Sequence, residues 1–596
     1  MHGPTQPASQ IIHADKYRGQ GEGFREANNR VAGALSDDEA HYQVFREITG
    51  DQRFLAAGRI QSAMGSTRAT TPYNCYVSGT IEDSFVDGHG SIMDRAREAA
   101  ATMRQGGGIG YDFSTLRPRG ANIKKLQSSS SGPIAFMDIF DAVCRCIASS
   151  GHRRGAQMGV LRVDHPDIEE FIRAKQPSEE MQRLWDAVAN IQDDHERAAA
   201  HAALQSTLRF SGFNVSVAVT DEFMLALKSG DGFDLKWGGS VYKTVDANAL
   251  WDMIMRSTWD WAEPGVLFID TINKMNNLYY CETLAATNPC GEQPLPPYGA
   301  CLLGSFNLVK YVRERLSGPG YREDRWFDIN QLLDDVEPVV RAMDNVVDRA
   351  RYPLYEQEKE ARQKRRMGLG VTGLANALEA LGFPYGSESF LSYEKDILSK
   401  LKNACYRASV KLAREKGAFP LYDCRYQRGN FIKTLDQDVQ EDIAKYGIRN
   451  SHLLSIAPTG TISFTADNVS SGVEPPFSYE YERRVRGPEG DVVHNCVDYG
   501  YWKWGVKGKT TADVTVDEHL QVLLTASQQV DSAVSKTCNI PGTVKWDEFK
   551  SVYTRAYEGG AKGCTTFRLD GKRTGILKAK GETSCTINPD GTKSCE

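Results

Sequence analysis

Residues 287–301 read TNPCGEQPLPPYGAC, and within these fifteen positions lie four prolines, two glycines and two cysteines. Proline fixes φ and lacks a backbone N–H, so these residues favour a fixed turn over a helix. In an extended segment, side chains two positions apart face the same side. Asn288, Cys290 and Glu292 can therefore converge on one ligand, and a second thiol, Cys301, follows at the end of the stretch.

The three converging groups permit several kinds of chemistry. A carboxylate can take or give a proton, an amide can orient a hydroxyl, and a thiol can be a nucleophile or a source of a sulfur radical. Taken alone, the stretch leaves two interpretations open. It is either a reactive loop or a Pro-rich turn that buries a small cysteine, Cys290, beside an exposed Glu292.

The composition limits the class of protein. The chain has 596 residues and a net charge of −6, which gives no reason to expect a surface that binds nucleic acid. No window reaches the roughly 18 apolar residues of a membrane span, and the N-terminus lacks the apolar core of a secretory signal. A cytoplasmic protein is expected. Thirteen scattered cysteines do not form the framework of a small secreted domain, so any pair is expected to be catalytic or redox-active.

Outside the loop, short apolar runs alternate with helical stretches, which indicates an α/β fold with a buried sheet. Examples are GIGYDF (108–113), FNVSVAV (213–219) and GVLFID (265–270). The expected divisions are a mostly helical region at 1–65, a main unit at 66–570 with a helical insertion at about 176–208, and a flexible tail at 571–596.

Several longer strings identify a family. NPCGEQPLPPYGACLLGSFNL (288–308) resembles the active-site finger loop of ribonucleotide reductase catalytic subunits. The two cysteines eleven residues apart resemble the adenosylcobalamin-dependent (class II) branch. The resemblance covers about residues 50–570 and includes YNCYVSGTIEDSF (73–85), RRMGLGVTGLANAL (365–378) and APTGTISFTADNVSSGVEPPF (457–477).

The resemblance implies a role for each central residue. Cys290 would become a thiyl radical that removes the 3′-hydrogen of the ribose, Glu292 would be the base toward the 3′-hydroxyl, and Asn288 would hydrogen-bond the substrate. Cys75 and Cys301 would be the dithiol that reduces the 2′-carbon and ends as a disulfide. That pairing requires the fold to bring their Cα atoms within about 7 Å.

Substrate and effector positions also follow from the resemblance. Thr459, Gly460 and Thr461 look like a turn start that favours an anion; by spacing alone a simple capping turn would explain them, and in the family they hold the substrate phosphates. The family pattern also places Asn74 and Gly107 beside the substrate. The residues expected to bind an allosteric deoxynucleotide or ATP are Asp83, Ser84, Arg117, Arg153 and Arg154.

The radical source separates the branches of the family. Class I subunits receive the radical from a partner through a Tyr-Tyr pair, whereas this chain has Thr565 and Thr566 at those positions, and threonine cannot relay an electron hole. The tail lacks the glycyl-radical motif of class III. Adenosylcobalamin is therefore the expected cofactor, with no protein metal ligand predicted. Cys75 lies so near the start that an ATP-binding activity domain before the barrel is not expected.

The tail sequence CTINPDGTKSC (585–595) predicts a hairpin. Asn588-Pro589-Asp590-Gly591 suits a type I turn with a bulge, which sets Cys585 across from Cys595. We expect this pair to shuttle electrons from a thioredoxin- or glutaredoxin-like reductant to Cys75 and Cys301. A metal site is the competing interpretation, weak without a second thiol pair.

The resemblance therefore implies a ribonucleotide reductase built as a ten-stranded α/β barrel of two parallel five-stranded half-sheets, with the Cys290 loop threading its centre. A homodimer without membrane or nucleic-acid contacts is expected by analogy with the family. Two other functions stay open. One is a class I-type large subunit that needs a radical-supplying partner, and the other is a catalytically silent nucleotide-binding regulator.

Overall fold

The structure is a computed structural model of the whole chain. It describes residues 3–595. The positions left out of that range are 125, 150–152, 194–195, 198, 201–202, 205–208, 316–323, 488–489, 569–570, 572–577, 580–584 and 588–592. Within the described residues, no helix combines the length and apolar character needed to cross a bilayer.

The centre of the molecule is an eight-stranded sheet in the order β15-β2-β3-β8-β9-β12-β23-β22. Neighbours from β2 to β12 are parallel, as are β22 and β23, while β15 runs antiparallel to β2 and β23 runs antiparallel to β12. The strands are β2 (Cys75–Val77), β3 (Gly108–Asp112), β8 (Gln157–Arg162), β9 (Phe213–Val219), β12 (Gly265–Phe268), β15 (Ala300–Cys301), β22 (Thr537–Ile540) and β23 (Gly563–Arg568).

A second sheet contains β1 (Phe54–Ala56), β16 (Leu303–Asn307) and β19 (Gly368–Thr372), with β16 and β19 parallel. Isolated parallel bridges join Leu369 to Leu454 and Ile456 to Val534, so the pairing continues from β19 toward β22 at the edge of the large sheet. At the other edge, only Leu302 separates β15 from β16. The two sheets are thus connected at both ends, and the α/β prediction is confirmed.

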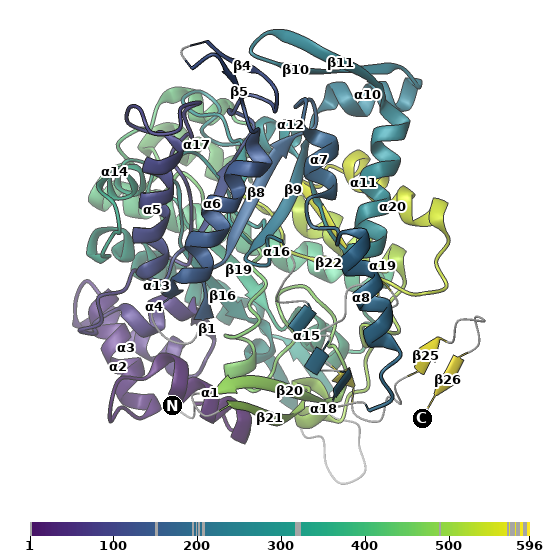
Figure 1. Ribbon diagram of the computed structural model, residues 1–596. Coiled ribbons are helices and arrows are strands. Elements are labelled where there is room, and N and C mark those ends of the chain that lie inside the picture. Colours follow the sequence, from purple (N-terminus) through teal and green to yellow (C-terminus); the bar gives the residue numbers. More distant parts are fainter. Residues whose placement is uncertain are drawn as a thin grey trace.

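Helices cover the outer face of the large sheet. In Figure 1, α5 and α6 lie to the left of β8, and α11 and α20 lie to the right of β9. The helices of this part are α5 (Ile92–Arg104), α6 (Pro133–Cys146), α7 (Ile168–Arg173), α8 (Glu179–Ala189), α10 (Asp221–Ser229), α11 (Ala247–Trp261), α12 (Ile269–Lys274), α19 (Val516–Ser527) and α20 (Trp546–Glu558). Apolar side chains of α5, α6, α7, α10, α11, α19 and α20 form one core with the strands. β9 is buried along almost its whole length, as expected for a parallel strand covered on both faces.

A second core surrounds the smaller sheet. It includes the long helices α13 (Ile329–Arg349) and α16 (Glu388–Lys416), which pack on each other. Ser387 caps the start of α16 by accepting a hydrogen bond from the Phe390 N–H, and Gly417, at a φ of 83°, follows its end. The other helices are α1 (Pro7–Tyr17), α2 (Phe24–Leu35), α3 (Glu39–Gly50), α4 (Gly58–Ala63), α14 (Tyr355–Lys364), α15 (Leu374–Ala380), α17 (Gln437–Tyr446) and α18 (Tyr499–Trp504).

The remaining strands form small sheets of two or three strands, and the β13–β14 pair carries the loop described below. The pairs are β4 (Asn122–Ile123) with β5 (Ser128–Ser129), β6 (Ala148–Ser149) with β7 (Arg153–Arg154), β10 (Gly232–Trp237) with β11 (Ser240–Asp246), β13 (Ala286–Thr287) with β14 (Pro294–Leu295), β17 (Val312–Arg315) with β18 (Asp324–Phe327), β20 (Glu480–Gly487) with β21 (Gly490–Val497) and β24 (Lys578–Ala579), and β25 (Cys585–Ile587) with β26 (Lys593–Cys595).

Candidate active site

The loop of residues 288–293 is the tip of the β13–β14 hairpin, and we call it the finger loop. Its turn is closed by the backbone and by Asn288. The Asn288 N–H donates to the Gln293 carbonyl at 3.1 Å, and the Gln293 N–H donates to Asn288 Oδ1 at 3.0 Å. Gly291 adopts a φ of 83°, which glycine tolerates without strain. The prolines and glycine thus produce the fixed turn that the sequence predicts.

The finger loop lies between the two sheets. On one side it runs so close to β3 that a Cβ on Gly110 would stand 1.8 Å from the Thr287 carbonyl oxygen. Asn214 of β9 donates to the Pro289 carbonyl at 2.8 Å. On the other side, the Ala533 N–H and the Ser455 hydroxyl both donate to the Glu292 carbonyl at 2.9 Å. The backbone of the loop is therefore held from both sides.

Glu292 is buried, with 2% of its surface exposed. Burial raises the pKa of its carboxyl to about 7, against the opposing effect of the Asn288 side chain. Among the described residues, Glu292 Oε2 and Asn288 Nδ2 are buried polar atoms without a hydrogen-bond partner. Since such atoms are costly unless something binds them, both are available to a ligand.

Cys290 is exposed at the tip of the loop, and open space surrounds its neighbour, since a Cβ on Gly291 would meet nothing within 4 Å. This arrangement contradicts the simple alternative of a buried cysteine beside an exposed glutamate. The exposed thiol and the buried, proton-accepting carboxyl are instead what a reactive loop requires.

The fold brings Cys75 and Cys301 together across 226 positions of sequence. β2 and β15 pair antiparallel with Cys301 directly opposite Cys75. Directly opposed residues have Cα atoms about 4.5–5.5 Å apart, within the range over which disulfides form. A Cβ on Gly108 of β3 would lie 3.2 Å from Cys75 Sγ, so this glycine leaves the thiol its space.

The predicted substrate residues fall into two groups. Asn74 and Gly107 lie beside Cys75 at the starts of β2 and β3, where the Asn74 carbonyl accepts from the Gly108 N–H at 2.9 Å. Asn74 Oδ1 is buried without a hydrogen-bond partner in the described part of the chain. Gly107 packs closely on the Tyr76 ring. These positions border the thiol pair.

The second group is the turn of Thr459, Gly460 and Thr461. Thr459 has a φ of 53°, unusual for a β-branched residue. Its hydroxyl accepts from the Gly472 N–H at 2.8 Å and hydrogen-bonds the Thr372 hydroxyl at 3.0 Å. Gly460 is exposed, with nothing within 4 Å of an added Cβ. The strained turn thus presents an open backbone surface, as a phosphate loop would.

Of the predicted effector residues, the structure brings two into contact. Arg117 donates to both carboxylate oxygens of Asp83, from its backbone N–H at 3.0 Å and from Nε at 2.7 Å. The Ser84 hydroxyl accepts from the Asp87 N–H at 3.1 Å. Arg153 and Arg154 form strand β7, but their side chains lie outside the described part of the structure.

At the positions of the missing tyrosine pair, Thr566 is buried and its hydroxyl hydrogen-bonds the Tyr553 hydroxyl at 2.9 Å, while Thr565 is exposed.

In the tail, β25 and β26 pair antiparallel with Cys585 directly opposite Cys595, the register that the turn sequence predicts. The turn itself, and much of the tail between 571 and 596, lie outside the described residues.

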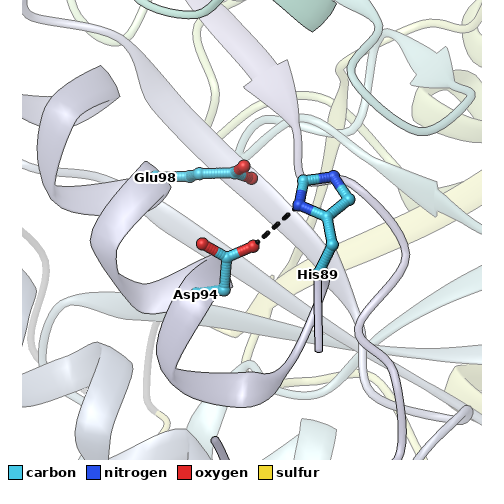
Figure 2. A group of neighbouring side chains, drawn as sticks. All are labelled: His89, Asp94 and Glu98. Atoms are coloured by element: carbon cyan, nitrogen blue, oxygen red, sulfur yellow. Dashed lines mark ion pairs between the residues drawn. The ribbon is translucent and has the colours of Figure 1, made fainter. Parts of the chain in front are cut away.

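One group of possible metal ligands occurs among the described residues: His89, Asp94 and Glu98 (Figure 2), with ligand atoms within 4.8 Å of one another. Their carboxylates already face guanidinium groups, because Arg97 binds Asp94 and Arg95 binds Glu98, each at 2.7 Å. The group therefore needs no metal ion to balance its charge.

Comparison with known proteins decides the family. The model of the ribonucleotide reductase barrel domain matches residues 74–567, a span that contains the finger loop and both thiols of the Cys75–Cys301 pair. The chain is a member of the ribonucleotide reductase family.

Several relatives of this reductase are named as vitamin B12-dependent enzymes. A vitamin B12-dependent ribonucleoside-diphosphate reductase of Mycobacterium tuberculosis (strain H37Rv) is 33% identical over 533 residues, covering 84% of this chain and 67% of the relative. A protein of the same name from Thermoplasma acidophilum is 31% identical over 534 residues, covering 85% and 62%. The reductase thus spans about two thirds of the length of these relatives.

Sequence reasoning missed the residues that hold the finger loop in the reductase. Asn214 and Ser455 each make a buried or partly buried hydrogen bond to the loop, and Thr372 makes one to Thr459. All three are common polar residues in otherwise apolar segments. Only the interruption of an apolar run, such as Asn214 in FNVSVAV, could have drawn attention to them.

Proposed function

We propose that this reductase converts ribonucleoside diphosphates to 2′-deoxyribonucleotides through a thiyl radical on Cys290, and so supplies precursors for DNA synthesis. The observation that carries the proposal is the finger loop itself. It presents an exposed thiol beside a buried carboxyl whose pKa burial raises to about 7. The diphosphate substrate is taken from the names of the relatives, which are ribonucleoside-diphosphate reductases.

Adenosylcobalamin is the proposed cofactor, as the names of the relatives suggest. The tip of the finger loop leaves room for adenosylcobalamin, because Cys290 is exposed and the space around Gly291 is open. Cys290 would receive the radical that this group supplies. When bound, adenosylcobalamin supplies the initiating radical by homolysis of its cobalt–carbon bond. The threonines at 565 and 566 favour this source over a tyrosine relay.

The residues of the chain then act in order. The Cys290 sulfur radical takes the hydrogen from C3′ of the ribose while Glu292, ionised above its pKa of about 7, accepts the 3′-hydroxyl proton. Asn288 has an unpartnered Nδ2 to hydrogen-bond the substrate.

The reduction itself requires two electrons and two protons. The thiols of Cys75 and Cys301 supply the two electrons and the two protons. The 2′-hydroxyl leaves as water, a C2′–H bond forms, and the two thiols become one disulfide. At the end Cys290 returns its hydrogen to C3′, and Glu292 returns the proton to the 3′-oxygen. The opposed register of the two cysteines supports this step.

Further parts of the family scheme fit the same arrangement. The bridges at 369–454 and 456–534, with the short link between β15 and β16, support closure of the two sheets into the ten-stranded barrel. A closed barrel would exclude water from the radical. The Cys585–Cys595 register supports a tail that re-reduces the disulfide with a thioredoxin- or glutaredoxin-like partner.

Allosteric control is the last part of the proposal. Contact between Asp83 and Arg117 supports a deoxynucleotide or ATP effector site shared with Ser84, Arg153 and Arg154, in a homodimer. The domain division proposed is 1–65, 66–570 and 571–596.

The test is an anaerobic assay of the purified chain with ribonucleoside di- and triphosphates, an effector nucleotide and dithiothreitol, with adenosylcobalamin present or omitted. We expect deoxynucleotide only with the cobalamin, and faster from diphosphates. Product formed without cobalamin, or no product in any tube, would reject the proposal.

A further inference from the structure

The strand that carries Cys301 is short. β15 has two residues, Ala300 and Cys301, so few ladder hydrogen bonds fix its register on β2. A slip of one residue would interchange the two faces of the sheet for the positions of β15. Something beyond the strand must hold Cys301 opposite Cys75.

Tyr298, three residues before Cys301, lies in the segment between β14 and β15. Its φ of 66° is left-handed, which a bulky side chain rarely adopts unless its surroundings hold it. Its N–H donates to the Ser78 carbonyl at 3.4 Å, and the Val77 N–H donates to the Gly299 carbonyl at 2.9 Å. Tyr298 is therefore fixed against the end of β2, the strand of Cys75.

The phenol of Tyr298 is bound by two charged groups of α5. The Arg95 guanidinium donates to the Tyr298 hydroxyl and lies 5.2 Å from the ring centre, a cation–π contact. The hydroxyl donates to Glu98 Oε2 at 3.4 Å, and Arg95 itself binds that oxygen at 2.7 Å. Arg95 and Glu98 are 5% and 6% exposed. Burial raises the pKa of Tyr298 to about 12, so the phenol stays neutral and can both donate and accept.

The same cluster holds the other strand. Arg95 Nε donates to the Thr80 carbonyl at 2.9 Å, in the segment that continues β2. A Cβ on Gly79 would lie 2.5 Å from the Tyr298 ring and 2.7 Å from the Arg95 guanidinium carbon, so only glycine permits this packing. Figure 2 shows Glu98 extending from α5 beside Asp94, toward the segment of His89. The Arg95 guanidinium therefore links α5 to the segment that follows β2 and to the segment that precedes β15, the two strands of the cysteine pair.

We propose that Tyr298, held by Arg95 and Glu98, is a positioning residue that keeps Cys301 in register with Cys75 and so promotes disulfide formation between them. This inference rests on the proposed function, which makes the two cysteines a redox pair. With the phenol released, the two-residue strand shifts more freely, the effective concentration of one thiol at the other falls, and the disulfide becomes easier to reduce.

The test is the thiol–disulfide equilibrium of the full-length chain with reduced and oxidised glutathione, without substrate or cobalamin. Each disulfide formed converts one oxidised glutathione to two reduced molecules. Alkylation and peptide mass spectrometry report the Cys75–Cys301 disulfide separately from that of the tail. We compare wild type with Tyr298→Phe, which keeps the ring but loses the hydroxyl, and with Arg95→Leu, which keeps the phenol but loses the cation.

The matched control is Tyr422→Phe, which like Tyr298→Phe loses two phenol hydrogen bonds, one to the Ile443 carbonyl at 2.9 Å and one from Gln427 Nε2 at 3.3 Å, far from the cysteines in the chain. We expect both test variants to lower the equilibrium constant of the Cys75–Cys301 disulfide at least tenfold, about 30 mV, and the control to leave it unchanged. A constant within twofold of wild type in Tyr298→Phe would overturn the positioning role alone. Failure of wild type to form this disulfide at all would overturn the proposed redox pair as well.

Discussion

Replacing Glu292 with glutamine should change both activity and the pH dependence of stability. In the folded protein, burial raises the pKa of Glu292 from 4.5 to about 7. Below pH 4.5 the carboxyl is protonated in both states. Between pH 4.5 and 7 the unfolded chain ionises while the folded protein still holds the proton, so folding loses stability as pH rises. Each pKa unit corresponds to about 1.4 kcal/mol, which makes the total loss about 3 kcal/mol at pH 8.

Glutamine does not titrate, so Glu292→Gln should not suffer this loss. We expect the free energy of unfolding of the variant, relative to wild type, to rise by about 3 kcal/mol between pH 4.5 and pH 8. Urea denaturation at four pH values, followed by circular dichroism, measures the difference. Turnover should fall about 100- to 10,000-fold, as expected for loss of a general base.

A matched control separates burial from catalysis. Burial also raises the pKa of Glu379 in α15 to about 7, and its carboxylate accepts from the Lys509 N–H at 2.7 Å, away from the finger loop in the chain. Glu379→Gln should show a similar gain of stability with rising pH and keep wild-type turnover. The reasoning is refuted if the relative stability of Glu292→Gln is flat with pH, or if that variant turns over like wild type.

Three further outcomes follow. Wild-type kcat/KM should increase with pH through about 7, because Glu292 must be ionised to act as a base, and a pH–rate profile checks this. Thr459→Ala removes the nearer acceptor of the buried Gly472 N–H and leaves it the Thr372 hydroxyl at 3.3 Å, so it should cost about 1 kcal/mol in urea denaturation and raise the substrate KM. Serine at both Cys585 and Cys595 should abolish thioredoxin-driven turnover yet spare a single turnover of the pre-reduced enzyme, as rapid-quench assays can show.

The sequence predicts the chemistry of the finger loop better than its surroundings. Proline spacing and the alternation of Asn288, Cys290 and Glu292 are local properties, and local chemistry determines the turn. The tail register, with Cys585 opposite Cys595, follows from turn type for the same reason. Burial of Glu292, by contrast, depends on β3 and on the segments of Ser455 and Ala533, which no local pattern reveals.

Long-range pairing is the part that sequence reasoning cannot supply. Cys75 and Cys301 meet only because β2 and β15 become neighbours in the sheet, and nothing near either cysteine specifies the other. The same holds for Arg95 and Tyr298, which lie on a helix and a loop 203 positions apart. Alternating apolar runs predict a buried parallel sheet, but strand order depends on contacts that form only in the folded chain.

The central claim, removal of the 3′-hydrogen by Cys290, is tested most directly with ribonucleotide deuterated at C3′, assayed anaerobically with adenosylcobalamin. We predict a primary isotope effect on kcat/KM, deuterium retained at C3′ of the product, and no product from Cys290→Ser. An unchanged rate with the deuterated substrate, or turnover by Cys290→Ser, would contradict the account.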